Sequence, residues 1–232
     1  MRLLEIGPLD PDYPAGLRPM GHAPRLWWWG TAGAADERCV ALVGTRSPTP
    51  AGLARARSLA RELADAGVTV VSGLARGIDT AAHEACLDAG GRTVAVLGCG
   101  AAQIYPPENA GLADRIAAHG AVLSQLPPDA PVSPAALRRR NRIIAALAAT
   151  TVVVEAGPTS GSRIAARCAL GLGRHLFLCD LAVREPWAEA LLARPGVCRL
   201  APDAGVGPLL ARLAEAPPTA PIQLALAMSA GR

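Results

Sequence analysis

The feature that most constrains the fold is a regular alternation of short apolar runs and helical segments, which begins at Cys39. The runs cover residues 39–44, 68–72, 92–98, 121–124, 150–156 and 175–179. Strands that alternate with helices and are apolar on both faces are typical of a parallel sheet covered on both sides. The sequence therefore predicts an α/β fold: a doubly wound, mostly parallel Rossmann-like sheet with helices on both faces. Too few strands are evident for a closed eight-stranded barrel.

Capping residues set the expected ends of the helices. Thr49 and Ser133 each precede a proline at the first helical position, and Asp79 stands before a third helical segment. We expect all three to be N-caps, because a side-chain oxygen there can accept a bond from a free backbone N–H group. Gly67 and Gly90 follow two of the segments and are expected to end them.

The flanking regions divide the chain into three parts. Residues 1–38 are rich in proline and contain Trp27 to Trp29, so we predict a short N-terminal extension packed on the core, with the tryptophans on or near an added strand. A stacking platform for bases is the alternative role for these tryptophans. Residues 39–200 form the predicted Rossmann-like domain, to which residues 187–202 could add a helix and a short strand. Residues 201–232 are predicted to be a C-terminal tail, with a linker at 216–221.

Composition and termini bear on location. Half of the residues are hydrophobic (51%), but no apolar run approaches the roughly eighteen residues that a membrane span requires. Pro8 and Asp10 interrupt the N-terminus too early for a signal peptide. We therefore predict a cytoplasmic protein with no membrane partner.

The six cysteines form no C-x-x-C pair, and most lie in apolar surroundings. This pattern predicts small buried side chains in a reducing compartment and no metal site.

The basic residues are all arginines, and the formal net charge is +4. Four of them lie between Arg138 and Arg142, in a predicted helix, with no acidic neighbour. Arg138 and Arg142 are one turn apart and could contact one phosphate track, although exposed arginines are commonly only solvated. Asn141 falls on the apolar face of this helix, where a buried amide needs partners, so we expect it to brace neighbouring loops.

Glycine, hydroxyl and arginine residues follow the carboxyl ends of several predicted strands. In a parallel sheet these ends share one edge, outside which ligands bind, and helix N-termini there attract anions. Arginine adds a fork of donors suited to phosphate. The sequence thus predicts an anion site at this rim, although any such sheet needs glycine at some turns. The rim residues are Gly44, Thr45, Arg46, Ser72, Gly73, Arg76, Gly77, Asp79, Gly98, Gly100, Glu155, Ser160, Gly161 and Ser162.

Familiar catalytic and nucleotide-binding patterns are missing. The chain has neither G-x-G-x-x-G nor G-x-x-x-x-G-K-[ST], so a P-loop ATPase is excluded. His83 lies four residues after Asp79, and the two could form either a structural or a catalytic pair. Glu155 could bind a ribose hydroxyl, act as a base in glycosyl-bond hydrolysis, or accept bonds from loop N–H groups. No nucleophile–base pair emerges, and we predict no catalytic residues, no enzymatic activity and no cofactor.

Five motifs occur in order: "VALVGTRSPTPAG", "VVSGLARGIDTAAHEACLDAGGRTVAVLGCG", "YPPEN", "RRRNRIIAALA" and "VVVEAGPTSGSRIAA". Together they closely resemble the DprA/Smf family of DNA-processing proteins, over roughly residues 9–180. The resemblance implies a single-stranded-DNA-binding protein that protects incoming strands in natural transformation, helps to load a RecA-type recombinase and forms homodimers. Carried over by motif, it adds Arg140, Asn141 and Arg142 to the rim residues as candidates for contact with DNA.

The sequence also departs from the pattern of that family. Thr45 replaces its usual serine, Gln125 its common glutamate, and Arg163 is added in the "SGSRIAA" segment. No winged-helix domain is expected after the Rossmann-like domain, although many members carry one. Two other classes stay open: a nucleotide-sensing module, and an enzyme that cleaves nucleotide N-glycosidic bonds. The absence of a P-G-G-x-G-T signature argues against the enzyme.

Overall fold

The computed structural model describes residues 3–31 and 38–215, and these residues contain one nine-stranded sheet. The strand order is β1-β2-β6-β5-β4-β3-β7-β8-β9. The strands are β1 (Leu4–Ile6), β2 (Leu26–Gly30), β3 (Cys39–Val43), β4 (Thr69–Ser72), β5 (Thr93–Val96), β6 (Ala121–Ser124), β7 (Thr150–Val153), β8 (His175–Cys179) and β9 (Val197–Leu200).

Strands β3 to β9 pair in parallel, whereas β1 and β2 are antiparallel to their neighbours. From β3 the chain proceeds through β4 and β5 to β6, and then returns to place β7 on the other side of β3. The order of strands therefore reverses between β3 and β7. In doubly wound sheets, ligands bind outside the carboxyl ends of the strands at such a reversal. The predicted fold class is confirmed.

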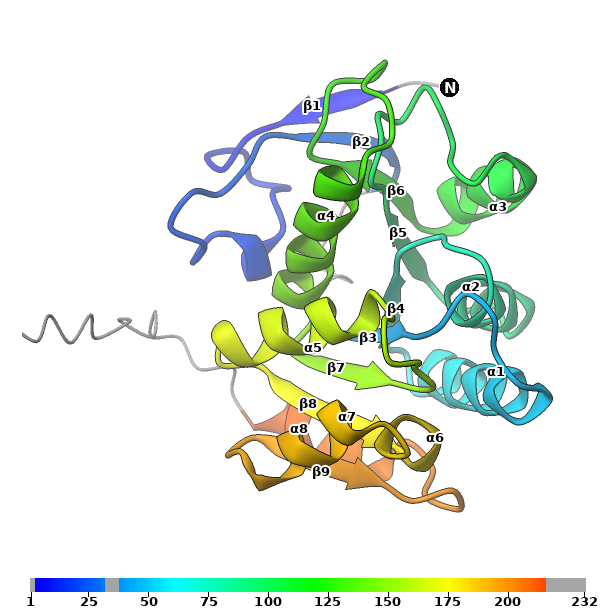
Figure 1. Cartoon of the computed structure of the whole chain (residues 1–232). Coiled ribbons are helices and arrows are strands. Elements are labelled where there is room, and N and C mark those ends of the chain that lie inside the picture. Colours follow the sequence, from blue (N-terminus) through cyan, green and yellow to red (C-terminus); the bar gives the residue numbers. More distant parts are fainter. Residues whose placement is uncertain (1–2, 32–37, 216–232) are drawn as a thin grey trace, which may run out of the picture.

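Helices cover both faces of the sheet (Figure 1). Helices α1, α2 and α3 lie along one face, and α4 and α5 along the other. The longer helices are α1 (Pro50–Asp65), α2 (Ile78–Asp88), α3 (Ala110–His119), α4 (Pro134–Leu147), α5 (Ser162–Gly171) and α8 (Gly207–Ala214). The shorter ones are η1 (Ala15–Leu17), η3 (Pro107–Asn109), α6 (Asp180–Val183), α7 (Pro186–Glu189) and η4 (Ala190–Ala193).

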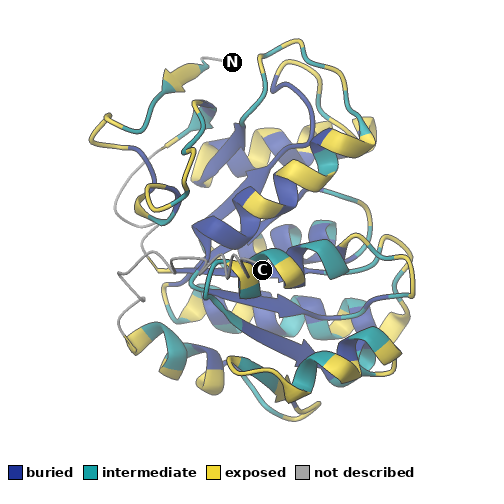
Figure 2. Cartoon of the chain, turned by 60° about the vertical axis from the view of Figure 1, so that its left-hand side comes forward, coloured by how far each residue is buried: buried dark blue, intermediate teal, exposed yellow. Residues whose placement is uncertain are grey.

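The apolar core follows these layers. Figure 2 shows most of the strands buried between helices whose outer surfaces are exposed, whereas β1, at the edge of the sheet, is largely exposed. Ile143 of α4 and Ala165 of α5 belong to the cluster on one face. On the other face, α1 and α2 contribute to a second cluster, and Ile116 of α3 belongs to a third. Burial on both faces explains why the strands are continuously apolar rather than alternating.

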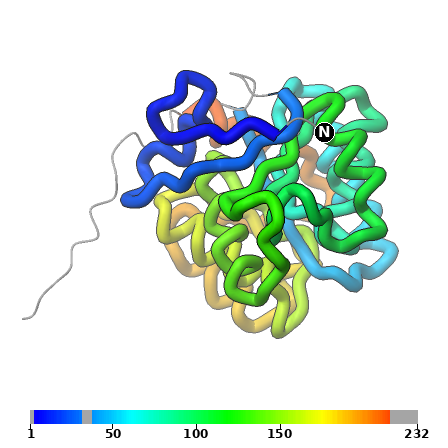
Figure 3. Tube along the Cα trace, turned by 90° about the horizontal axis from the view of Figure 1, so that it is seen from above, coloured from blue at the N-terminus to red at the C-terminus, as the bar shows by residue number. Residues whose placement is uncertain are grey.

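The N-terminal segment joins the sheet through its tryptophan run. Trp27, Trp28 and Trp29 all lie in β2, which pairs with β6, so their predicted place on an added strand is confirmed. Trp28 is only 1% exposed and belongs to the same core cluster as Tyr13, whose hydroxyl donates to the carbonyl of Pro24 (2.6 Å). Figure 3 shows the segment, in blue, at one side of the molecule beside the green part of the chain, which includes β6. Buried in this way, Trp28 offers no face on which a base could stack.

Two of the three predicted N-caps are confirmed. The Thr49 hydroxyl accepts from the N–H of Gly52 (3.1 Å), and Ser133 caps α4 in the same way. The prediction for Asp79 is wrong, because α2 begins two residues earlier than that cap implies, at Ile78, with Gly77 at the N-cap. The Asp79 carboxylate instead turns back toward the preceding loop.

The C-terminal part contains the short strand expected within 187–202, as β9, and a helix that the sequence analysis missed, α8. Arg55 of α1 donates to the carbonyl oxygens of Ala201 (3.0 Å) and Ala204 (2.6 Å), which fixes the segment leading to α8. The linker and tail predicted at 216–232 lie outside the described residues. Within residues 3–31 and 38–215, no helix has the length and apolar character needed to span a membrane.

Candidate anion-binding site at the strand ends

Three loops meet where the order of strands reverses. The N–H of Thr45, after β3, donates to the carbonyl of Glu155, after β7 (2.8 Å). The carbonyl of Thr45 accepts from the N–H of Ile78, at the start of α2 (3.2 Å). Backbone bonds therefore join segments that are far apart in the sequence, as the parallel sheet predicts.

Two glycines between β4 and α2 are required by close contacts. Gly77 has φ +81°, and a Cβ atom there would lie 2.5 Å from the Thr45 carbonyl oxygen. A Cβ atom on Gly73 would lie 1.6 Å from an Arg140 guanidinium nitrogen. These glycines let the loops pack against one another and admit Arg140 beneath the turn. Their first role is thus internal packing.

A cleft of about 430 Å³ lies at this junction, between the β3 loop and the facing surfaces of α4 and α5. Among the described residues that line it are three arginines, Arg46, Arg138 and Arg140, and one carboxylate, Asp79. The excess of cations favours an anion. Predicted site residues in its lining are Gly44, Thr45, Arg46, Asp79, Arg140, Asn141, Ser160, Gly161 and Ser162.

Arg140 is buried beneath the Gly73–Asp79 turn and is only 6% exposed. Its guanidinium donates to the carbonyl of Gly73, and to that of Val96 at 3.1 Å. The Asp79 carboxylate, also 6% exposed, accepts from the N–H groups of Gly73 (3.2 Å) and Ala75 (3.4 Å). The two side chains thus organise the turn from below.

Burial acts against both of these charges. It raises the pKa of Asp79, while the Arg140 charge and the backbone N–H groups act in the opposite direction. Burial likewise lowers the pKa of Arg140, and the Asp79 charge opposes that shift. Each charge therefore offsets part of the cost of burying the other. Direct contact of Arg140 with DNA remains a prediction.

The N-terminus of α5 forms the opposite wall of the cleft. Ser160 and Ser162 lie with their hydroxyl oxygens 2.7 Å apart, and Ser160 also accepts from the N–H of Ser162 (3.3 Å). The Asn141 side chain donates to the carbonyl of Gly161 (3.1 Å), which confirms the expected bracing role. A helix N-terminus with hydroxyl groups offers several donors to one anion.

The exposed arginines differ in their partners. Arg46 lines the cleft and makes no ion pair with any other described residue. Arg142 is exposed on α4 but does not line the cleft. Arg76 also lies outside the cleft, and its Nε donates to the carboxylate of Glu108.

Two predicted site residues face the interior of the rim. Glu155 accepts from the N–H (3.0 Å) and the hydroxyl (3.1 Å) of Thr49, so its carboxylate serves the N-terminus of α1. This is the third of the roles considered for it. The Ser72 hydroxyl donates to the carbonyl of Leu42 (2.6 Å) and is fully buried. The structure brings neither side chain into the cleft.

His83 does not meet Asp79. Its Nδ1 lies 2.7 Å from the hydroxyl of Thr93, and the side chain is fully buried. Burial, together with the nearby charge of Arg140, lowers the pKa of His83 to about 3. A neutral, enclosed imidazole is a structural group rather than a proton donor to a ligand.

Cysteines and acidic groups make no metal site among residues 3–31 and 38–215. Burial raises the pKa of Cys86 to about 12 and that of Cys179 to about 11, so both remain thiols.

The sequence analysis missed the partners of the glycine turn. Glu108 and Asn109 lie in the "YPPEN" segment, and Asn109 donates to the carbonyl of Leu74 (2.9 Å) and the hydroxyl of Thr80 (2.9 Å). Their separation of about thirty residues from the turn leaves no local sequence signal of this contact.

These features define a class: a Rossmann-like protein with an arginine-lined cleft where the order of strands reverses. Residues 5–192 match the model of the family described as DNA recombination-mediator protein A. The chain belongs to that family, the DprA/Smf proteins, as its motifs predicted.

Relatives support this assignment. The chain is 42% identical to Protein Smf of Synechocystis over 74% of its length, and 47% identical to a putative DNA processing protein DprA of Mycobacterium tuberculosis over 69%. It spans 44% and 42% of these two relatives, which is less than half of each.

Solved structures agree. DNA processing protein A from Streptococcus pneumoniae is 32% identical, with a TM-score of 0.81 over 91% of this chain and 74% of that one. The protein from Helicobacter pylori, reported for its unique single-stranded DNA binding mode, is 26% identical, with a TM-score of 0.77 over 93% of this chain and 95% of that one. Molybdenum cofactor carrier proteins, at 19% identity and a TM-score of 0.56, share the fold alone.

Proposed function

We propose that this chain binds single-stranded DNA through the cleft and the adjoining rim. The observation that carries the proposal is the cleft lining: three arginines against one carboxylate, facing the hydroxyl groups and the N-terminus of α5. Arginine and backbone N–H groups contact phosphates and carry no base information, so we expect little sequence preference. The Helicobacter pylori relative, which binds single strands, supports this function.

The wider role follows from family membership. We propose that the chain acts in DNA processing during transformation, protects incoming strands, forms homodimers and helps to load a RecA-type recombinase, within the cytoplasm. The relatives from Synechocystis and Mycobacterium tuberculosis, of which the chain spans 44% and 42%, support this role.

A binding titration tests the central proposal. Fluorescence anisotropy would compare a labelled single strand, a duplex of the same sequence and a mononucleotide at several salt concentrations. We expect the single strand to bind most tightly. Each phosphate neutralised should add about 0.7 to the slope of log affinity against log salt. An affinity that does not change between low and physiological salt would contradict the proposal.

A nucleotide sensor is the second candidate, because a cleft of about 430 Å³ has the size of a small-molecule site. The same titration separates the two: the affinity of a sensor would not increase from a mononucleotide to a longer oligomer.

We propose no hydrolytic turnover. The Glu155 carboxylate, which would have to act as the base in glycosyl-bond cleavage, is bonded to Thr49 and does not line the cleft. Incubation with nucleoside monophosphates and DNA, followed by product analysis, tests this. Free base or cleaved DNA that disappears in Glu155→Gln would favour the enzyme.

A further inference from the structure

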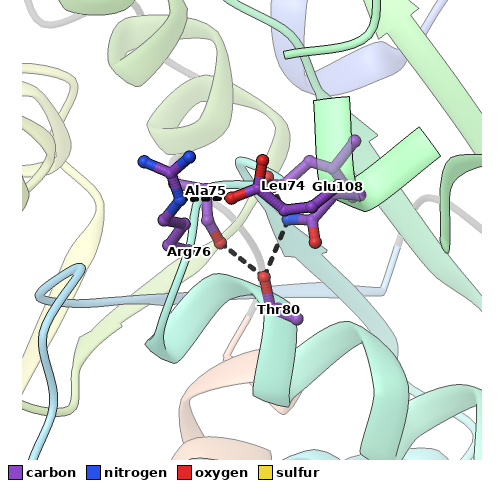
Figure 4. A network of polar contacts seen from close by, with 6 residues as sticks. Leu74, Ala75, Arg76, Thr80 and Glu108 are labelled. Atoms are coloured by element: carbon purple, nitrogen blue, oxygen red, sulfur yellow. Dashed lines mark hydrogen bonds and ion pairs between the residues drawn. The ribbon is translucent and has the colours of Figure 1, made fainter. Parts of the chain in front are cut away.

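An acidic side chain, that of Glu108, is paired with Arg76, the arginine of the turn between β4 and α2. Nε of Arg76 donates to the carboxylate of Glu108, which lies in η3, about thirty residues further along the chain (Figure 4). Their side chains are 57% and 47% exposed, so the pair lies at the surface, where a ligand can reach it. Arg76 and Arg46 line one small hollow beside the main cleft. A DNA strand held at Arg46 would therefore pass close to the pair of Arg76 and Glu108.

The carboxylate is held in place from below. Asn109, only 7% exposed, donates to the carbonyl of Leu74 (2.9 Å) and to the hydroxyl of Thr80 (2.9 Å). Thr80 in turn donates to the carbonyl of Ala75 (2.7 Å), as Figure 4 shows. These bonds attach η3 to the same turn that carries Arg76. Glu108 therefore meets Arg76 from a fixed base rather than as a freely moving surface side chain.

Carboxylate and phosphate use the same donors of a guanidinium group. We infer that Glu108 is an internal competitor for phosphate at Arg76, which a DNA strand must displace. This inference rests on the proposed binding of single-stranded DNA. Hydrogen bonding to Arg76 lowers the pKa of Glu108, so the competing group stays ionised at neutral pH.

The competition favours long polyanions over small ones. When an isolated phosphate binds Arg76, the arginine exchanges its contact with Glu108 for a contact with phosphate, so the net gain in binding free energy is small. A strand that is already held at Arg46 presents its next phosphate at high effective concentration, so the exchange costs it less. Glu108 would thus weaken the binding of every anion at Arg76, and the binding of free nucleotides most of all.

Four variants test the inference by anisotropy on a labelled oligothymidylate at low salt. Glu108→Gln keeps the size of the side chain and removes its charge, and we expect binding at least threefold tighter than that of the unmodified chain. Glu108→Ala, which cannot bond to Arg76, gives a second variant with the same expectation. Arg76→Ala and the double variant Arg76→Ala with Glu108→Gln show whether the gain requires the arginine.

Asp88→Asn is the matched control. Asp88 forms an exposed ion pair with Arg115 (2.8 Å) at the end of α2, where its side chain is 61% exposed. Helix α2 connects two parallel strands and therefore runs antiparallel to them. Its C-terminal end lies near the amino ends of the strands, whereas the cleft lies at their carboxyl ends. Asp88→Asn removes one negative charge, as Glu108→Gln does, but far from the rim. It therefore measures how much the change in net charge alone alters DNA affinity.

The outcomes are distinct. A gain in Glu108→Gln that exceeds that of Asp88→Asn, and that vanishes without Arg76, supports the inference. A gain no larger than that of Asp88→Asn, a gain that persists without Arg76, or weaker binding together with a lower melting temperature overturns it. If the unmodified chain does not bind the oligomer, the proposed function fails and this inference fails with it. If it binds and Glu108→Gln binds no more tightly, only the inference fails.

Discussion

The two halves of the rim carry their arginines in opposite settings. In the Gly73–Asp79 turn, Arg76 is paired with Glu108, and Arg140 beneath it donates to two backbone carbonyls beside Asp79. In the cleft between the β3 loop and α5, Arg46 is exposed and forms no ion pair with another described residue. The turn uses buried Arg140 to hold its backbone and keeps Arg76 paired with Glu108, whereas Arg46 in the cleft is available to a ligand.

This difference shows that an arginine at a strand end is not by itself evidence of binding. A guanidinium group satisfies a carbonyl or carboxylate of its own chain as well as a phosphate. Burial and partners separate the two uses, and they predict different consequences of mutation: loss of stability at buried Arg140 and loss of affinity at exposed Arg46.

The largest effect is expected for Arg140→Ala. The change removes a charge that favours ionised Asp79, and it leaves the carbonyls of Gly73 and Val96 without their charged donor. Hydrogen bonds to a charged group contribute about 1.5–3 kcal/mol each to the free energy of unfolding, and this variant loses two of them. Urea denaturation measures this loss, with exposed Arg142→Ala as the control, where we expect a change within about 0.5 kcal/mol. Equal stability of the two variants would remove the contrast between buried and exposed arginines.

Arg46→Ala is expected to affect binding rather than folding. Loss of a charge-assisted contact costs about 1.5–3 kcal/mol, or roughly tenfold or more in DNA affinity. Lysine should restore only part of it, because a point charge lacks the bidentate geometry. Arg115→Ala removes the same charge from a surface ion pair on α3 and serves as the control. Unchanged affinity in a folded Arg46→Ala variant would reject the cleft as the binding site.

His83, which is buried in α2, makes the stability of the protein sensitive to acid. Its pKa is about 3 in the folded chain, against an ordinary value of 6.5, so only the unfolded chain takes up the proton between these values. Stability should therefore be full above pH 6.5 and fall by about 1.4 kcal/mol per pH unit as the pH drops toward 3. His83→Gln should flatten this dependence in denaturation curves. The same slope in both proteins would contradict the assignment.

The smallest effect is expected for Glu155→Gln. The carboxylate accepts two bonds from Thr49 at the start of α1, and a negative charge at a helix N-terminus contributes about 0.3–1 kcal/mol. We expect a melting temperature lower by a few degrees, with DNA affinity nearly unchanged because Glu155 does not line the cleft. An unchanged melting temperature together with a tenfold loss of DNA affinity would show that Glu155 contributes to binding rather than to the stability of α1.

Much of the fold could be predicted from the sequence because its signals are local. Continuous apolar runs gave the parallel strands, and Thr49 and Ser133 gave two helix starts. Asp79 failed as a cap because its carboxylate finds N–H groups in the preceding turn, a contact that depends on the turn's conformation. Helix α8 and strand β1 were missed because short segments carry weak periodicity.

For the site, the sequence by itself determined which residues gather at one rim. Parallel strands place their carboxyl ends together, and the motifs marked Thr45, Arg46 and Ser160 there. Only the tertiary structure decided which side chains face outward: it buried Arg140, turned Glu155 toward Thr49 and brought Glu108 to Arg76. The physical reason is that order along the chain fixes position in the sheet, whereas the partner of each charge depends on packing between segments far apart in the sequence.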